Sequence, residues 1–170
     1  YMLTDDNQRY REAEELLTNL VVESNKFLDA YDWLAKTHEA NGQFQEAQTV
    51  LQDAVTISPH AVRRLRKLGD IALETGDMET AERSFQQVVS KAKYSEFRDP
   101  EDHLRLVRTL VHKGDTAMAG AVVRDLEKSL HAANKMPACR ALSAALIHAH
   151  KGDTDKATEQ LGIAVVACRE

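Results

Sequence analysis

A cassette of glycine, four further residues and alanine occurs four times in this chain of 170 residues. It first reads Gly42-Gln-Phe-Gln-Glu-Ala47, and it returns at 76–81, 114–119 and 152–157. The copies lie 34, 38 and 38 residues apart, and a fixed period in this range is typical of solenoids built from stacked helical hairpins. The period therefore predicts an all-α solenoid.

Apolar residues flank each cassette at helical spacing. Phe27, Tyr31, Leu34 and His38 precede Gly42 at intervals of three and four residues, and a second stripe follows it. Each unit therefore reads as helix, tight turn, helix. Glycine suits the left-handed conformation that ends the first helix. Three aspartates follow turn glycines and are expected to cap the second helix, namely Asp77, Asp115 and Asp153.

The three prolines mark the expected starts of first helices, since proline is tolerated in a first turn. They are Pro59, Pro100 and Pro137. Asp99 precedes Pro100 and is expected to cap its helix. Each 38-residue step carries four residues more than the 34-residue step, and we place these extra residues at 91–98 and 131–135.

Composition excludes several classes of protein. Hydrophobic residues form 43% of the chain and charged residues 29%, as in soluble helical proteins. A net charge of −5 has the wrong sign for a protein that neutralises phosphates, which disfavours nucleic acid as a partner. No stretch reaches the ~20 apolar residues of a membrane helix, and no signal peptide opens the chain, so we expect a cytoplasmic protein without a membrane segment. Cys139 and Cys168 lack the spacing of a zinc or redox motif and are expected to be free thiols on helices.

These units resemble the tetratricopeptide repeat (TPR), a helical hairpin of 34 residues in its regular form. The best match lies between Leu28 and Lys93. Its first copy places Tyr31, Leu34-Ala35, His38, Gly42, Ala47, Leu51, Ala54 and Pro59 at the pattern positions, and the second places Leu65, Leu68-Gly69, Ala72, Gly76, Ala81, Phe85 and Val88 there. Related families such as Sel1-like repeats share this degenerate pattern.

The resemblance implies a right-handed superhelix and one repeat domain over residues 1–170. We expect a partial repeat at 1–26, whose helix begins after Asp6-Asn7, and full repeats at 27–60, 61–98, 99–136 and 137–170. The runs at 27–36 and 58–69 are similar to the repeat tail of bacterial proteins that join a receiver domain to these repeats. This similarity implies a piece of a larger bacterial two-component signalling protein.

Catalytic and metal-binding motifs are missing from the sequence. His148 and His150 lie two residues apart, so a regular helix points them to different sides. No zinc-protease, nucleophile-elbow or phosphate-loop motif occurs. We therefore predict no enzyme activity, no cofactor and no metal.

The resemblance also implies that the first helices line a concave face whose non-core residues select a partner protein or peptide. The charged and aromatic candidates are Asp32, Trp33, Lys36, Arg63, Arg66, Lys67, Asp70, Arg105 and Arg108, followed by Leu142, Ser143 and Leu146. Arginine pairs bidentately with carboxylate, so the basic part of this face suits an acidic peptide. The alternative is a solvated face with local pairs such as Arg66 with Asp70. The lysine and asparagine clamp of chaperone-tail binders is not reproduced, since Asp32, Lys36 and Lys67 occupy the equivalent places.

The last helix is apolar around much of its circumference, and no polar capping helix follows it. Its candidate interface residues are Leu161, Val165 and Val166. Terminal repeats ordinarily present a polar outer face, so we expect a further segment, a partner or a second copy of the chain to cover it. The sequence thus predicts a non-enzymatic protein-interaction scaffold that binds a partner in its groove, self-associates, or both. The alternative is a nucleic-acid adaptor that uses the basic stripe from Arg63 to Arg108.

Overall fold

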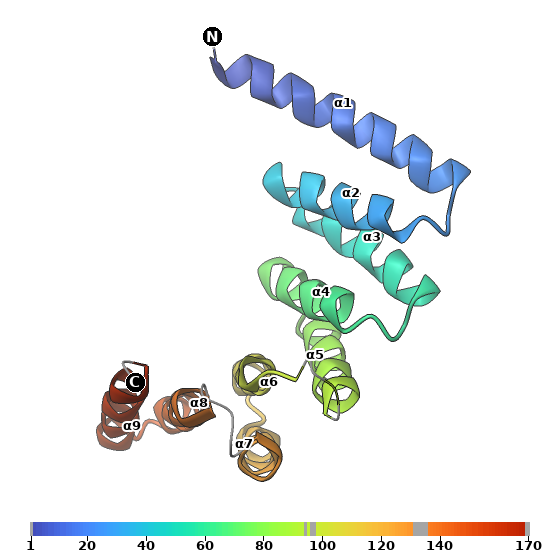
Figure 1. The fold of residues 1–170 in the computed structure, drawn as a ribbon. Coiled ribbons are helices and arrows are strands. Elements are labelled where there is room, and N and C mark those ends of the chain that lie inside the picture. The colour runs from blue at the N-terminus through green and yellow to red at the C-terminus, as the bar shows by residue number, and fades with distance from the viewer. Residues whose placement is uncertain (1, 94, 96–97, 131–135, 169–170) are drawn as a thin grey trace. The chain divides into compact units, whose positions relative to one another are not determined.

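The computed structural model describes residues 2–93, 95, 98–130 and 136–168, with side chains from Arg9 onward except at 129–130. The described residues form helices and connections without a strand, which confirms the all-α prediction (Figure 1). The helices are α1 (Met2–Glu23), α2 (Leu28–Ala40), α3 (Phe44–Ile57), α4 (Val62–Thr75), α5 (Met78–Ala92), α6 (Pro100–His112), α7 (Thr116–Leu130), α8 (Met136–His150) and α9 (Thr154–Ala167).

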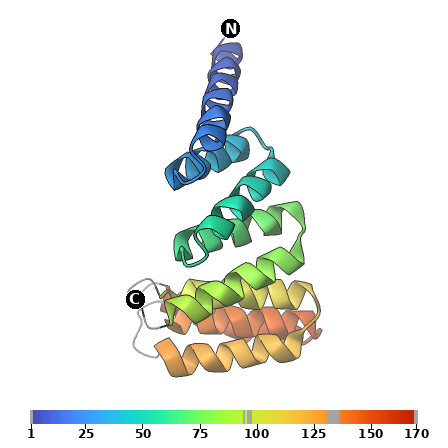
Figure 2. The same cartoon turned by 90° about the vertical axis from the view of Figure 1, so that its right-hand side faces the viewer.

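Two compact units divide the chain. The N-terminal unit spans Tyr1–Asp77 and the C-terminal unit spans Met78–Glu170. In the N-terminal unit each helix from α1 to α4 packs against the next one. In the C-terminal unit successive helices from α5 to α9 also pack pairwise, and α6 additionally packs against α8 (Figure 2). The α6–α8 contact joins the first helices of two hairpins.

The turn glycines adopt the left-handed conformation that the cassette predicts. Their φ angles are 73°, 77°, 84° and 78° at Gly42, Gly76, Gly114 and Gly152. Beyond the last turn of α6, the Gly114 N–H donates to the Val111 carbonyl and the Asp115 N–H donates to the Leu110 carbonyl. These bonds satisfy carbonyls that the end of the helix leaves open.

The capping aspartates behave differently from one another. Asp115 caps α7 as predicted, since its Oδ1 accepts from the Met118 N–H at 2.9 Å. The prediction was wrong for Asp153, whose side chain makes no capping bond. Its Oδ2 instead lies 2.9 Å from Lys156 Nζ, in an ion pair within the first turn of α9.

The prolines also divide into confirmed and corrected predictions. Pro100 is the first residue of α6, where Asp99 Oδ1 accepts from the Glu101 N–H at 3.0 Å, and Pro137 is the second residue of α8. Pro59 does not open a helix, because 58–61 form a turn in which the Ala61 N–H donates to the Ser58 carbonyl, and α4 begins at Val62.

Connection lengths agree with one predicted insertion. Residues 93–99 join α5 to α6, whereas the shorter stretch 58–61 joins α3 to α4. The longer connection thus falls where 91–98 was predicted, except that 91–92 still belong to α5. The other predicted location, 131–135, lies outside the described residues. Helix α1 already begins at Met2, so the expected start after Asp6-Asn7 was wrong; neither glycine nor proline interrupts the segment.

Each unit has an apolar core. In the N-terminal unit, Leu51 of α3 and Ile71 of α4 are each 1% exposed and belong to one cluster with Ala35, Ala47 and Leu68. In the C-terminal unit, Leu126 of α7 is fully buried with Cys139 of α8. None of the described helices is both long enough and apolar enough to cross a lipid bilayer.

Candidate functional site

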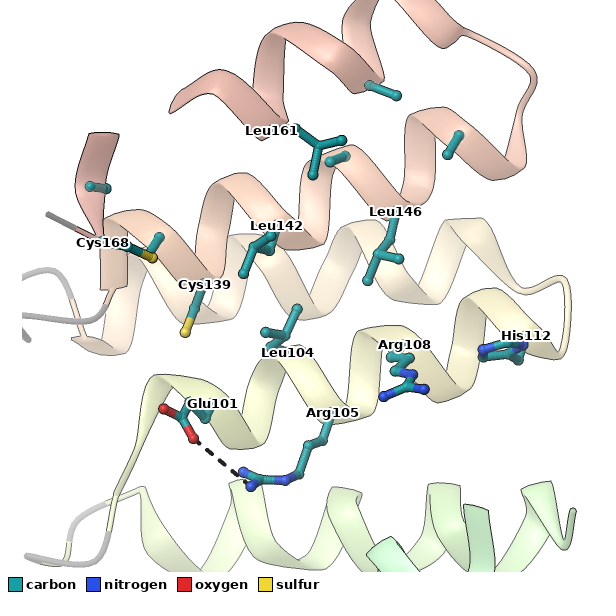
Figure 3. A pocket seen from close by; sticks show the side chains of 15 residues that line it. Glu101, Leu104, Arg105, Arg108, His112, Cys139, Leu142, Leu146, Leu161 and Cys168 are labelled. Atoms are coloured by element: carbon teal, nitrogen blue, oxygen red, sulfur yellow. Dashed lines mark ion pairs between the residues drawn. The ribbon is translucent and has the colours of Figure 1, made fainter. Parts of the chain in front are cut away.

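A groove of about 1050 Å³ lies among α6, α8 and α9 of the C-terminal unit. The labelled leucines of the three helices gather between them, and the charged side chains follow one another along α6 (Figure 3). The lining residues are Glu101, Leu104, Arg105, Arg108 and His112 of α6, then Ala138, Cys139, Leu142, Ala145, Leu146 and Ala149 of α8, and Ala157, Leu161, Ala167 and Cys168 at α9.

The groove follows the axes of α6 and α8, because their lining residues recur at helical spacing. On α6 the lining extends from Glu101 to His112, and on α8 from Ala138 to Ala149. Eleven residue steps at ~1.5 Å of rise per residue correspond to about 16 Å on each helix. The groove is therefore roughly three helical turns long.

Small residues of α8 build the floor. Ala138 and Ala145 line the groove and are buried, and their short side chains let neighbouring helices approach closely. Beneath the floor, Leu126 of α7 packs with Cys139, and the partly buried Leu104 joins this cluster. The floor is thus held by the core of the C-terminal unit.

Ser143 does not line the groove, contrary to its predicted place on the binding face. It is fully buried, and its Oγ donates to the Cys139 carbonyl at 2.7 Å. This bond satisfies the hydroxyl within α8 itself, so the side chain fits the core. Leu142 and Leu146 do line the groove, as the sequence predicts.

Charge in the groove comes from α6 alone. Arg105 lies 3.9 Å from Glu101 Oε2 and 3.5 Å from the Oδ1 of buried Asp102, so acids of its own helix balance it. Arg108 is exposed, and no hydrogen bond or ion pair to it occurs within the described residues. Arg108 is therefore the cation that the groove offers to a ligand.

Both cysteines line the groove, and both are free. Cys139 is buried, as expected of a small apolar residue, whereas Cys168 at the end of α9 is exposed. Within the described residues no group of three or more histidines, cysteines and acids could hold a metal ion.

His103 of α6 is a buried polar residue that the sequence did not single out. It is 5% exposed, its Nε2 lies 3.6 Å from Asp125 Oδ2, and neither ring nitrogen has a hydrogen-bond partner in the described part of the chain. Burial lowers the pKa of His103 below its ordinary value, and the nearby carboxylates of Asp125 and Asp102 oppose this only in part. Its ring is outside the groove and borders a small cavity together with Val89 and Ala92 of α5.

The predicted residues of the N-terminal unit lie on α2 and α4, and several are paired. Arg64, which the sequence did not single out, donates to both carboxylate oxygens of Asp32 at 2.7 and 2.8 Å. Lys67 Nζ lies 2.6 Å from a carboxylate oxygen of Glu39. These pairs join α2 to α4. They use the charges of Asp32 and Lys67, which the sequence analysis predicted to contact a partner protein.

Three candidates of this unit remain open to solvent. Trp33 is 58% exposed, and Lys36 Nζ lies 4.8 Å from the centroid of its ring, which is a cation–π distance. Arg63 is exposed and has no ion-pair partner among the described residues. Arg66 and Asp70 each make a polar interaction. Arg105 and Arg108 belong to the other unit, so the residues of the predicted basic stripe are divided between the two units.

The exposed residues of α9 form two groups. Leu161 is 47% exposed and lines the groove, whereas Val165 and Val166 are 52% and 59% exposed and lie outside it. Val166 borders a separate depression of about 510 Å³, together with Glu159, Gly162, Ile163 and Ala167. The apolar surface that the sequence predicts on the last helix is therefore present.

Comparison with known proteins places these helices among solved repeat structures. The family model for the tetratricopeptide repeat matches residues 6–68 and 40–97, which together exceed half of the chain. No curated protein matches the sequence. A crystal structure of MamA is similar over 97% of this chain and 92% of that one, at 14% identity and a TM-score of 0.72.

Two further structures are similar to the same extent. YrrB, described as a TPR protein with an unusual peptide-binding site, is 16% identical with a TM-score of 0.71, over 97% of this chain and 81% of that one. A putative kinesin light chain of Podosopora anserina, with nearly identical TPR-like repeats, is 22% identical with a TM-score of 0.69, over 95% and 88% of the two chains. At these identities the likeness establishes the fold.

Proposed function

Because this chain belongs to the tetratricopeptide repeat family, we propose that it is a non-enzymatic scaffold that holds a segment of a partner protein in the α6–α8–α9 groove. The groove itself carries this proposal, since it joins an apolar floor to the exposed Arg108, which has no ion-pair partner among the described residues. Proteins of this family commonly mediate protein–protein contacts, and the solved YrrB structure is described as having a peptide-binding site.

A long protein segment suits the groove better than a small metabolite. Small-molecule sites enclose most of the ligand surface. Here Arg108, Ala149, Leu161 and Cys168 line the groove and are all exposed, so the groove is open along its length. A protein segment can cover such a surface while its own outer face stays in water.

A second surface of the scaffold is proposed on α2 and α4. The exposed Trp33 offers a large aromatic contact, with Lys36 stacked on it, and the exposed Arg63 can meet an acid. Asp32 and Lys67 then act mainly by joining α2 to α4, through their pairs with Arg64 and Glu39. Self-association through Val165 and Val166 is a further proposed contact of the scaffold.

The nucleic-acid alternative has less support. Arg64 and Lys67 of α4 are paired with Asp32 and Glu39, and the net charge is −5. A bacterial two-component signalling role with a linked receiver domain remains a prediction that rests on the resemblance of residues 27–36 and 58–69. A cytoplasmic location remains a prediction from the composition of the sequence.

Site-specific photo-crosslinking in the native host tests the scaffold proposal. A photoreactive residue in place of Leu146 should give discrete protein adducts, because that side chain lines the groove. The same residue in place of Lys128, exposed on α7 and outside the groove, is the matched control. Adducts of equal pattern at both positions, or none at Leu146, would refute partner binding in the groove.

A further inference from the structure

We infer that the occupant of the α6–α8–α9 groove is an amphipathic helix of a partner protein, with an apolar stripe about three turns long and an acidic residue beside it. This inference rests on the proposed function and adds the chemistry of the partner. Three observations support it: the size of the groove, the restriction of its polar side chains to α6, and the exposed cation Arg108 among them.

The dimensions match a helix. The lining of α6 and of α8 extends over about 16 Å, which is the length of about eleven helical residues. A helix of that length and about 10 Å across occupies roughly 1,250 Å³. The groove volume of about 1050 Å³ is comparable, so a helix can sit between α6 and α8 with its outer face in solvent.

The floor favours an apolar stripe over a polar peptide backbone. The lining residues from α8 and α9 are alanine, leucine and cysteine, and none of them offers a strong hydrogen-bonding side chain to an extended chain. A helix satisfies its own backbone groups and presents side chains instead. On α8 the small alanines at 138, 145 and 149 alternate with Leu142 and Leu146, and such an uneven apolar surface suits the side chains of a partner helix.

The polar edge selects an acid. Glu101 and Arg105 neutralise each other on α6, and buried Asp102 also faces Arg105. Within the part of the chain that the structure describes, Arg108 is the lining cation to which no ion pair is made, and His112 lies one turn further on. A glutamate or aspartate on the partner helix can pair with Arg108, whereas a lysine there is repelled.

A set of stapled helical peptides tests the inference. All peptides carry a stripe of leucines at alternating intervals of four and three residues. The three peptides differ in the residue on both flanks of this stripe, which is glutamate, glutamine or lysine. Because both flanks carry the same residue, a peptide brings the same charge to α6 in either direction of binding. Fluorescence anisotropy measures each affinity at about 50 mM and about 500 mM salt. We expect the glutamate peptide to bind about tenfold more tightly than the lysine peptide at low salt, with a smaller ratio at high salt.

Variants assign these affinities to the groove. Arg108→Glu should reverse the order of the two charged peptides, whereas Lys128→Glu makes the same charge change on α7 and should leave the order intact. Leu161→Gln should weaken all peptides by about fivefold, because the exposed Leu161 lines the groove. Met118→Gln is its control, because Met118 of α7 is 47% exposed, as Leu161 is, and lies outside the groove.

The outcomes separate the two proposals. If the three peptides bind equally and Leu161→Gln weakens them all, the acidic edge is wrong and groove binding stands. If none of them binds, the helical occupant is wrong, and photo-crosslinking decides separately whether a partner enters the groove. Binding of a fluorescent fatty acid that is lost in Arg108→Glu, without peptide binding, would assign the groove to an anionic lipid and overturn the inference.

Discussion

Replacing glycine with alanine should change stability in opposite directions at two positions of the C-terminal unit. Gly114 ends the α6 turn with a φ of 84°, and Gly162 lies inside α9 with helical geometry. A Cβ built at either position meets no atom within 4 Å. Packing is therefore equal in the two cases, and backbone conformation alone decides the sign.

The magnitudes follow from that conformation. Alanine in the left-handed region costs about 1–2 kcal/mol, and the smaller conformational entropy of the unfolded chain returns about 0.4–1 kcal/mol of it. Gly114→Ala should therefore lower the free energy of unfolding by about 1 kcal/mol. Gly162→Ala should raise it by about 0.5–1 kcal/mol, because alanine favours a helix interior over glycine.

Urea unfolding followed by circular dichroism at the helical band measures both changes. Gly114→Asn serves as an internal standard, because asparagine tolerates the left-handed region and should cost less than alanine. The slope of free energy against urea must stay constant for the comparison to report native-state stability. A stabilising Gly114→Ala, or two changes of the same sign, would show that the backbone argument fails here.

Two further predictions concern α6 and α9. Acidification from about pH 7.5 to about pH 5.5 should lower the free energy of unfolding more in the wild type than in His103→Phe. The pKa of His103 is lower in the folded state than in the unfolded state, so over this range the unfolded state binds more protons and is favoured by acid. Asp125, Asp102 and Asp99 favour the charged ring in the fold, and Lys93 also borders its small cavity; equal pH profiles in a thermal-melt series would contradict the argument. Light scattering should show a dimer that Val165→Glu converts to monomer, since that change puts charge on an exposed apolar side chain; a wild type that stays monomeric at high concentration would exclude this contact.

The sequence was sufficient to predict turns and helix starts where a single residue determines the backbone conformation. The left-handed turns at Gly42 and Gly114, and the start of α6 at Asp99-Pro100, depend on φ and on a capping carboxylate. Asp153 shows where this reasoning fails, since its carboxylate forms an ion pair with Lys156. The Gly-Asp turn motif predicts a capping aspartate, but it does not show whether a lysine one turn further on will form an ion pair with that aspartate.

The groove was harder to predict, because it depends on the positions of three helices. The sequence placed Leu142 and Leu146 on the binding face, but it also placed Ser143 there, whose hydroxyl is satisfied within α8. Alanines at 138, 145 and 149 lie on one face of α8 at helical spacing, and this pattern was a readable signal of a shallow floor. The pairing of Asp32 with Arg64 required knowledge of how α2 faces α4.

Because the charged lining residues all come from α6, different helices determine the shape and the charge of the groove. Shape is set by α8 and α9, while the sign of the charge is set by exposed positions of a single helix. Substitutions at Arg108 and His112 can therefore retarget the site one charge at a time without repacking Leu126 against Cys139. A duplicated copy of this chain has a short mutational route to a new client, and an engineer has the same route to a panel of orthogonal scaffolds.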